Sequence, residues 1–138
     1  MRSFSVQNQM ESLSALVQRL LAEHRDFSSK SQALDHSISK SEFASVSDII
    51  LSLRESLIDH MLVEETEIFP EVSRRGFFNE RISEIMQQHV EITAALDRIR
   101  FALHRKNIQE LKVVFDELAQ LMNTHFPAEE EEVFPLVT

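Results

Sequence analysis

The sequence predicts an all-α protein, an up-down-up-down four-helix bundle with an internal two-fold repeat of one helical hairpin. Apolar residues recur every three or four positions along four segments, as in helices with one face in a core. The 138 residues include one glycine and three prolines, and they show no strand-type alternation. A segment similar to 60–72 also recurs 65 residues later, at 125–137. Such self-similarity is typical of a duplicated structural unit.

The periodic segments place four helices at about 6–37, 42–67, 79–103 and 108–132. The connections within the first pair and within the second pair are short, which makes the paired helices antiparallel. We expect one domain spanning residues 1–138, long enough to bury a core.

Helix ends are predicted from capping residues and prolines. Ser39 and Asn107 each precede a glutamate by three residues, as in a capping box, and they predict the starts of the second and fourth helices. Asn79 is expected to cap the third helix. Pro70 and Gly76 are expected to mark the connection between the second and third helices, and Pro135 is expected to end the fourth helix.

Polar residues interrupt the apolar stripes at equivalent points of the repeat. Counted from turns near residues 40 and 106, four histidines lie within about one helical turn of the same level, at ~1.5 Å per residue. Two of them precede a glutamate by four residues, so one ion can contact both side chains. The predicted metal-binding set is His24, His60, Glu64, His89, His125 and Glu129.

A metal site explains this set better than separate core histidines. A single histidine in an apolar stripe is more often a hydrogen-bonded core residue, and we keep that interpretation for His36 and His104. Four histidines at one level and two buried carboxylates instead favour bound cations, because buried carboxylates are costly without them. Imidazole and carboxylate ligands without sulfur suit iron, manganese or zinc.

Residues beside this set are interpreted as packing or surface. The ten phenylalanines are expected in the core, with Phe69 and Phe134 closing the bundle end beside the site. Pro127 is expected to bend the last turn of the fourth helix. The remaining acidic residues next to the set are expected to form a solvated rim; they include Glu65, Glu67, Glu130 and Glu132.

Composition excludes several kinds of partner. A net charge of −9 argues against binding to nucleic acid or to an anionic membrane. No apolar run approaches the ~20 residues of a membrane span, and the first six residues lack the apolar region of a signal peptide. We therefore expect a cytoplasmic protein. The chain has no cysteine, so thiolate ligands and disulfides are excluded.

Over almost the whole chain, the sequence resembles the haemerythrin-like (HHE cation-binding) family. The resemblance rests on His24, His60-x-x-x-Glu64, His89 and His125-x-x-x-Glu129, and on two Glu-Glu-x-Glu-(Ile/Val)-Phe-Pro tails. It implies a four-helix bundle with a non-haem di-iron centre. In that pattern Glu64 and Glu129 bridge the two irons, and the histidines are terminal ligands.

Two departures separate this chain from the oxygen-carrying members. Those have a fifth histidine four residues after the one on the third helix, where this chain has Thr93. Their fourth-helix carboxylate is an aspartate five residues after the histidine, whereas Glu129 follows His125 by four. Glu67, Glu132 or a water are the candidates for the place of the fifth histidine. The resemblance is thus to the broader group, with members in iron sensing, nitric-oxide response and iron–sulfur cluster repair.

Three functions remain open at this point. The favoured one is binding or sensing of O2, NO or cellular iron at an open di-iron site. The second is a small di-iron oxidase or a peroxide- or NO-consuming enzyme, although the absence of Tyr and Trp rules out a radical relay through them. The third is a metal-stabilised regulatory module that binds a protein partner.

Overall fold

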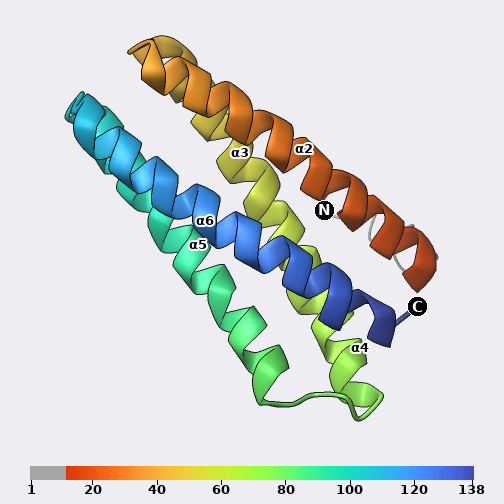
Figure 1. Cartoon of the computed structure of the whole chain (residues 1–138). Coiled ribbons are helices and arrows are strands. Elements are labelled where there is room, and N and C mark those ends of the chain that lie inside the picture. The colour runs from red at the N-terminus through yellow and green to blue at the C-terminus, as the bar shows by residue number, and fades with distance from the viewer. Residues whose placement is uncertain (1–11) are drawn as a thin grey trace, which may run out of the picture.

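The protein is all-helical in a computed structural model that describes residues 12–138. Figure 1 shows a bundle of four long helices, and the described part of the chain contains no strand. The prediction of a helical bundle is confirmed, although residues 6–11 of the first expected helix lie outside the described residues. The long helices are α2 (Leu13–Ser39), α3 (Phe43–Val63), α5 (Glu80–His104) and α6 (Ile108–Glu132).

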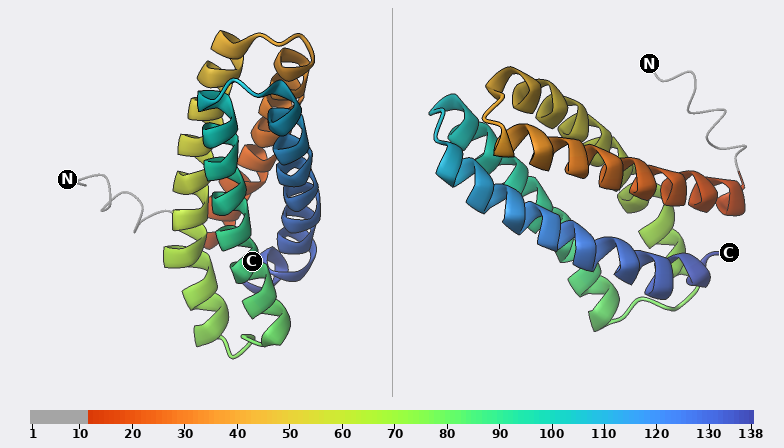
Figure 2. Two further views of the ribbon diagram at one scale, coloured as in Figure 1. Left: turned by 90° about the vertical axis from the view of Figure 1, so that its left-hand side faces the viewer. Right: turned by 45° about the horizontal axis from the view of Figure 1, so that its top comes forward.

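The four helices surround one interior. Helix α2 packs along α3 and α6, and α5 packs along α6 and α3. The short turns that follow α2 and α5 lie at one end of the bundle, and the connection between residues 75 and 79 lies at the other end (Figure 2). Side chains that point inward at one level from different helices therefore come together.

Most helix starts follow the predicted capping. Asn79 accepts a hydrogen bond from the backbone N–H of Ile82 at 3.0 Å, and Asn107 accepts one from Glu110 at 3.1 Å. Ser12 caps α2 in the same way through the N–H of Ala15. These bonds satisfy N–H groups that have no partner within the first turn of a helix.

The predicted capping box at Ser39 is wrong. Ser39 is the last residue of α2, and its hydroxyl donates to the carbonyl of His36. Glu42 occupies the N-cap of α3 without a side-chain hydrogen bond. The chain reverses through a left-handed residue, Ser41 at φ 54°, and the turn before α6 uses Lys106 at φ 53° in the same place. A left-handed residue after a helix closes its last turn. Ser39 therefore belongs to the end of α2, and its hydroxyl is not available to cap α3.

The second helix does not end near Pro70. A π-helical turn, η1 (Glu64–Ile68), follows α3 and leads into α4 (Phe69–Arg74). Pro70 lies in the first turn of α4, where its missing N–H is tolerated. The helical path ends near Gly76, which has φ 81°. After α6 the chain forms a short 3-10 turn, η2 (Phe134–Leu136), so Pro135 marks the end of the fourth helix as predicted.

The core consists of two apolar clusters. The larger extends from Phe27 to Met122 toward the short turns, and the smaller contains Leu16, Ile85 and Phe134 toward the other end. The level occupied by the predicted metal ligands separates them. Among the phenylalanines that the structure describes, Phe77, Phe78 and Phe101 are exposed, so the expectation of a core position is wrong for these three; Phe4 lies outside the described residues. Among the described helices, none carries an apolar stretch long enough to cross a bilayer.

Candidate metal centre

All six predicted ligands meet between the two apolar clusters. Each long helix contributes at least one of them, and none of the six is more than 4% exposed. They form two overlapping groups whose nearest ligand atoms lie within 4.8 Å of one another. Both groups contain Glu64 and Glu129; the first adds His24 and His60, and the second adds His89 and His125. That these residues hold a metal ion stays a prediction.

In each of the four predicted ligand histidines, the outer ring nitrogen Nδ1, which faces away from the centre of the cluster, contacts a polar side chain. In each ring Nδ1 lies 2.7 Å from an oxygen: Glu130 for His24, Glu23 for His60, Glu65 for His89, and Gln88 for His125. Carboxylate and amide oxygens accept hydrogen bonds, so Nδ1 is the donor in these contacts. Nε2 of each ring is then directed toward the centre, as in metal sites where an outer acceptor orients the histidine.

When each imidazole carries only its outer proton, the inner nitrogens and the carboxylate oxygens face one another without a hydrogen atom between them. Nε2 of His24 lies 3.1 Å from Nε2 of His60, and both are acceptors when the outer nitrogens carry the protons. Glu64 lies 3.0 Å from His60 and 3.1 Å from His89, yet among the described residues neither of its oxygens has a partner in hydrogen-bond geometry. Nε2 of His125, 3.0 Å from Glu129, is likewise unsatisfied.

This donor set fits a pair of cations. Buried acceptors that face one another without hydrogen atoms repel, and a cation at the centre would remove that repulsion. Each group offers two imidazole nitrogens and one oxygen from each of two carboxylates. Oxygen and nitrogen donors in this ratio suit iron, manganese or zinc.

Protons compete with a cation for two of the histidines. Burial alone lowers the pKa of His60, but its hydrogen bond to Glu23 and the nearby Glu64 carboxylate outweigh burial and raise the pKa to about 9. Burial also lowers the pKa of His89, and the carboxylates of Glu129 and Glu64 raise it to about 10. Metal binding would therefore release protons from this site.

The two central carboxylates differ in their response to burial. Burial, followed by the charge of Glu129, raises the pKa of Glu64 above its usual value. Burial also acts to raise the pKa of Glu129, but the imidazoles of His125, His24 and His89 outweigh it and lower the pKa. Two like charges this close favour ionisation of one carboxylate at the expense of the other. Cations would allow both to be ionised.

Sequence reasoning found the central residues but missed their outer partners. Glu65 and Glu130 were expected only to form a solvated rim; they are exposed as predicted, yet each accepts from a ligand histidine. The predicted set contains neither Glu23 nor Gln88. A signal was available, because each of the four outer partners is the direct sequence neighbour of a predicted ligand.

Other predicted roles are confirmed only in part. Glu67 and Glu132 are exposed, and Glu132 pairs with Arg81 at 2.8 Å, so neither belongs to the central cluster. His36 and His104 lie outside the cluster as predicted, but both are exposed, so their interpretation as core histidines is wrong. The place of a fifth histidine is taken by Thr93, whose hydroxyl donates to the carbonyl of His89 at 2.9 Å.

Aromatic rings cover the cluster unevenly. Phe69 and Phe134 are buried beside it as predicted, each with its ring centre 5.8 Å from that of a histidine. The sequence did not indicate two further contacts, the stack of Phe126 on His24 at 4.2 Å and the edge contact of Phe27 with His60 at 5.0 Å. Three of these four phenylalanines thus touch the His24–His60 side.

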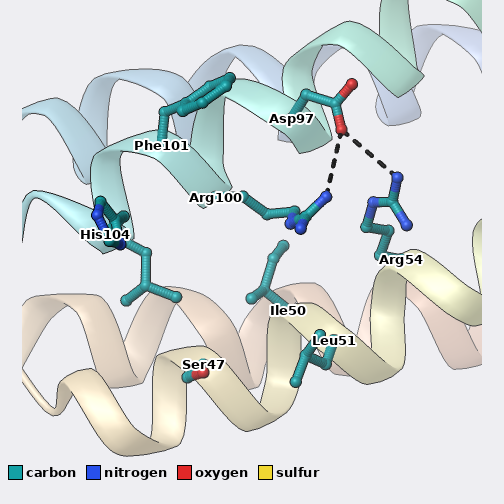
Figure 3. Close-up of a pocket in the computed structure, with 9 residues that line it drawn as sticks. Ser47, Ile50, Leu51, Arg54, Asp97, Arg100, Phe101 and His104 are labelled. Carbon is teal, nitrogen blue, oxygen red and sulfur yellow. Dashed lines mark ion pairs between the residues drawn. The ribbon is translucent and has the colours of Figure 1, made fainter.

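Of two surface pockets, one reaches the cluster of predicted ligands and the other does not. A shallow one of about 350 Å³ is lined by His89, Glu65 and Thr93, so it reaches the edge of the cluster. A larger one of about 760 Å³ lies between α3 and α5, where Arg54 and Arg100 face Asp97 (Figure 3). None of the predicted ligands lines this larger pocket, which lies nearer the short turns.

Comparison with known proteins supports the cation-binding interpretation. Residues 80–138 match the sequence model of a family described as Hemerythrin HHE cation binding domain. The match covers α5 and α6, which carry His89, His125 and Glu129. No curated protein and no solved structure matches the chain. The resemblance inferred from the residues is thereby confirmed for residues 80–138: through its α5–α6 hairpin, this chain is similar to the Hemerythrin HHE cation-binding family.

Proposed function

We propose that residues 1–138 form one haemerythrin-like domain that holds two non-haem iron ions and binds or senses a small ligand there. His24 and His60 would hold one ion, His89 and His125 the other, and Glu64 and Glu129 would bridge them. The observation that carries this proposal is the pair of overlapping ligand groups that share both buried carboxylates. Manganese and zinc are the alternatives for the same donors.

An up-down-up-down bundle built from two copies of one hairpin accounts for the symmetry of the site. A shift of 65 residues relates His24 to His89 and His60 to His125. It also relates Ser41 and Lys106, the left-handed residues of the two short turns. We extend the family assignment to the first hairpin on this basis, since it supplies half of the ligand set.

The side chains around the proposed ions leave room for a small ligand. Iron bound by these residues would supply coordination of O2 or NO and one-electron chemistry. The Thr93 hydroxyl is engaged with the backbone, and Glu67 is exposed, so neither substitutes for a fifth histidine. The pocket beside His89 gives a short route from solvent. The phenylalanines on the opposite side limit entry of water there.

Titration of the iron-loaded protein with NO tests this function. Protein loaded with Fe²⁺ under anaerobic conditions is expected to change its visible absorption on addition of NO, with saturation at a fixed ratio to iron. His89→Ala should reduce both bound iron and the spectral response. His104→Ala is the matched control, because His104 is exposed and outside the cluster; it should behave as the wild type. Iron-loaded protein that shows no response to NO or to air would contradict the ligand-binding role.

A further inference from the structure

The outer partners of the histidines follow the internal repeat except at one position. Glu65 and Glu130 are related by the shift of 65 residues, and they hold the equivalent histidines His89 and His24. Residues 23 and 88 are related in the same way and hold the other two histidines, but one is a glutamate and the other a glutamine. The outer shell is therefore symmetric in geometry and asymmetric in charge.

This difference in charge distinguishes the two proposed ion positions. Both outer partners of the His24–His60 pair are carboxylates, Glu130 and Glu23. The His89–His125 pair has one carboxylate, Glu65, and one neutral amide, Gln88. Because the two positions share Glu64 and Glu129, their inner charges are the same, and the glutamate-to-glutamine difference is the charge difference between the outer partners.

A carboxylate partner strengthens a histidine as a metal ligand in two ways. It adds a negative charge one imidazole away from the cation, and it polarises the ring toward the inner nitrogen. Arg19 lies 3.9 Å from Glu23, but both side chains are substantially exposed, so solvent weakens that pairing. The amide of Gln88 orients the ring of His125 without adding charge.

The aromatic contacts of the two positions also differ. Phe126 stacks on His24 and Phe27 contacts the edge of His60, whereas His89 lines the shallow pocket that also contains Thr93. All four histidines are almost completely buried, so their exposed fractions do not rank the two positions. The shallow pocket nevertheless lies beside the position with less negative charge.

We propose that the two ion positions are inequivalent, with the His24–His60 position binding its cation more tightly and the His89–His125 position acting as the weaker, exchangeable one. Glu23 and Gln88 are the positioning residues that set this difference. The inference rests on the proposed two-ion site and adds to it which position is filled first and which is open to exchange.

Single-position variants allow each affinity to be measured separately. His125→Ala removes a ligand of the second position, and His60→Ala removes one of the first. Dissociation constants for Fe²⁺ are measured anaerobically by competition with a coloured chelator, with circular dichroism to establish folding. We expect His125→Ala to bind its remaining Fe²⁺ roughly 10-fold or more tightly than His60→Ala does, in the range typical of outer-partner effects.

Exchanging the two outer residues then tests their role. Glu23→Gln should weaken Fe²⁺ binding in the His125→Ala background, and Gln88→Glu should tighten it in the His60→Ala background, each by roughly 10-fold. The crossed combinations are matched controls. Gln88→Glu with His125→Ala and Glu23→Gln with His60→Ala alter residues whose histidine is absent, so the affinity should not change.

The outcomes separate this inference from the proposed function. Equal affinities in the two backgrounds, or no response to either exchange, overturn the inequivalence even when the wild type binds two Fe²⁺ per chain. A wild type that binds no Fe²⁺ overturns the two-ion site, and this inference with it.

Discussion

The two hairpins of the molecule place the same ligands with different backbones. In the first, the α-helix gives way at Glu64 to a π-helical turn in which the N–H of Phe69 donates to the carbonyl of Glu64. In the second, α6 continues through Glu129 to Glu132 and contains Pro127. Both devices relax the regular helical ladder beside the buried carboxylate. The two hairpins therefore place the glutamate side chain in the same position, and they differ in the backbone hydrogen bonds around it.

Equivalent side chains of the two hairpins are buried to the same extent, although the backbone hydrogen bonds around them differ. Glu64 and Glu129 are both fully buried, as are Ile68 and Val133. π-Helical turns inside α-helices are frequent at functional sites, and the one in this chain begins at a predicted ligand. The family match also distinguishes the hairpins, because it covers the second and not the first. The part of the first hairpin in the proposed metal site therefore rests on where its side chains lie and not on the family match.

The largest expected effect compares a bridging glutamate with its neighbour. Glu64→Ala removes a ligand from both positions and should lower the bound iron from two ions per chain to fewer than one. Glu65→Ala removes only the outer partner of His89, so both ions should remain, with roughly 10-fold weaker binding at one position. Metal analysis after gel filtration measures both. Equal losses of iron in the two variants would mean that Glu65, too, contacts metal.

A core substitution tests whether the hairpins contribute equally to stability. Leu53 on α3 and Leu118 on α6 are related by the shift of 65 residues, and both are completely buried in the larger cluster. Replacement of either by Ala should lower the free energy of unfolding by about 2–5 kcal/mol, through lost burial and the cavity left behind. Urea denaturation of metal-free protein measures this. A loss confined to one hairpin would show that the other does not take part in cooperative folding.

Helix caps sharpen the comparison on a smaller scale. Asn107→Ala should lower the free energy of unfolding by ~1 kcal/mol, because it removes an acceptor from the first turn of α6. Glu42→Ala, at the equivalent place before α3, should change it by less than ~0.5 kcal/mol, since Glu42 makes no capping hydrogen bond. Thermal and urea unfolding of the pair check this. A larger loss for Glu42→Ala would contradict the geometry of the first turn.

The smallest expected effect belongs to α4, whose place after α6 is taken by the 3-10 turn η2. Hydrogen bonds from Arg74, and then from Arg75, lower the pKa of Glu71 from its usual 4.5 to about 2. A lowered pKa means that this group stabilises the folded state above about pH 4.5 and loses that effect as the pH falls toward 2. The melting temperature of Glu71→Gln should thus lie slightly below that of the wild type at pH 6. The difference should disappear by about pH 2; a constant difference would argue against the pKa shift.

The sequence predicted the helices and the central ligands for a clear physical reason. Helix formation and side-chain direction depend on local spacing, so the stripe containing His60 and Glu64 specified both the helix and its inner face. Histidines on different helices reached one level because helix length per residue is constant. The outcome confirmed that His24, His89 and His125 come together with this pair.

The features that the sequence did not predict depend on the hydrogen-bond register within a helix and on the rotation of one helix relative to another. A π-helical turn and an α-helix hold the same residues and differ by one hydrogen-bond position, so the continuation past Pro70 was not visible. Whether Glu130 faces solvent or His24 depends on the rotation of α6 relative to α2. The predicted box at Ser39 failed because a left-handed Ser41 closes the preceding helix first.

The number of iron ions bound per chain tests the account most directly. Metal-free protein is loaded with Fe²⁺ under anaerobic conditions, desalted, and analysed for iron and protein, with His36→Ala as a control outside the cluster. The account predicts two ions per chain in the wild type and in the control, and one in His60→Ala and in His125→Ala. One ion per chain in the wild type, or two in a variant that lacks Glu64, would contradict a two-ion centre bridged by the buried glutamates.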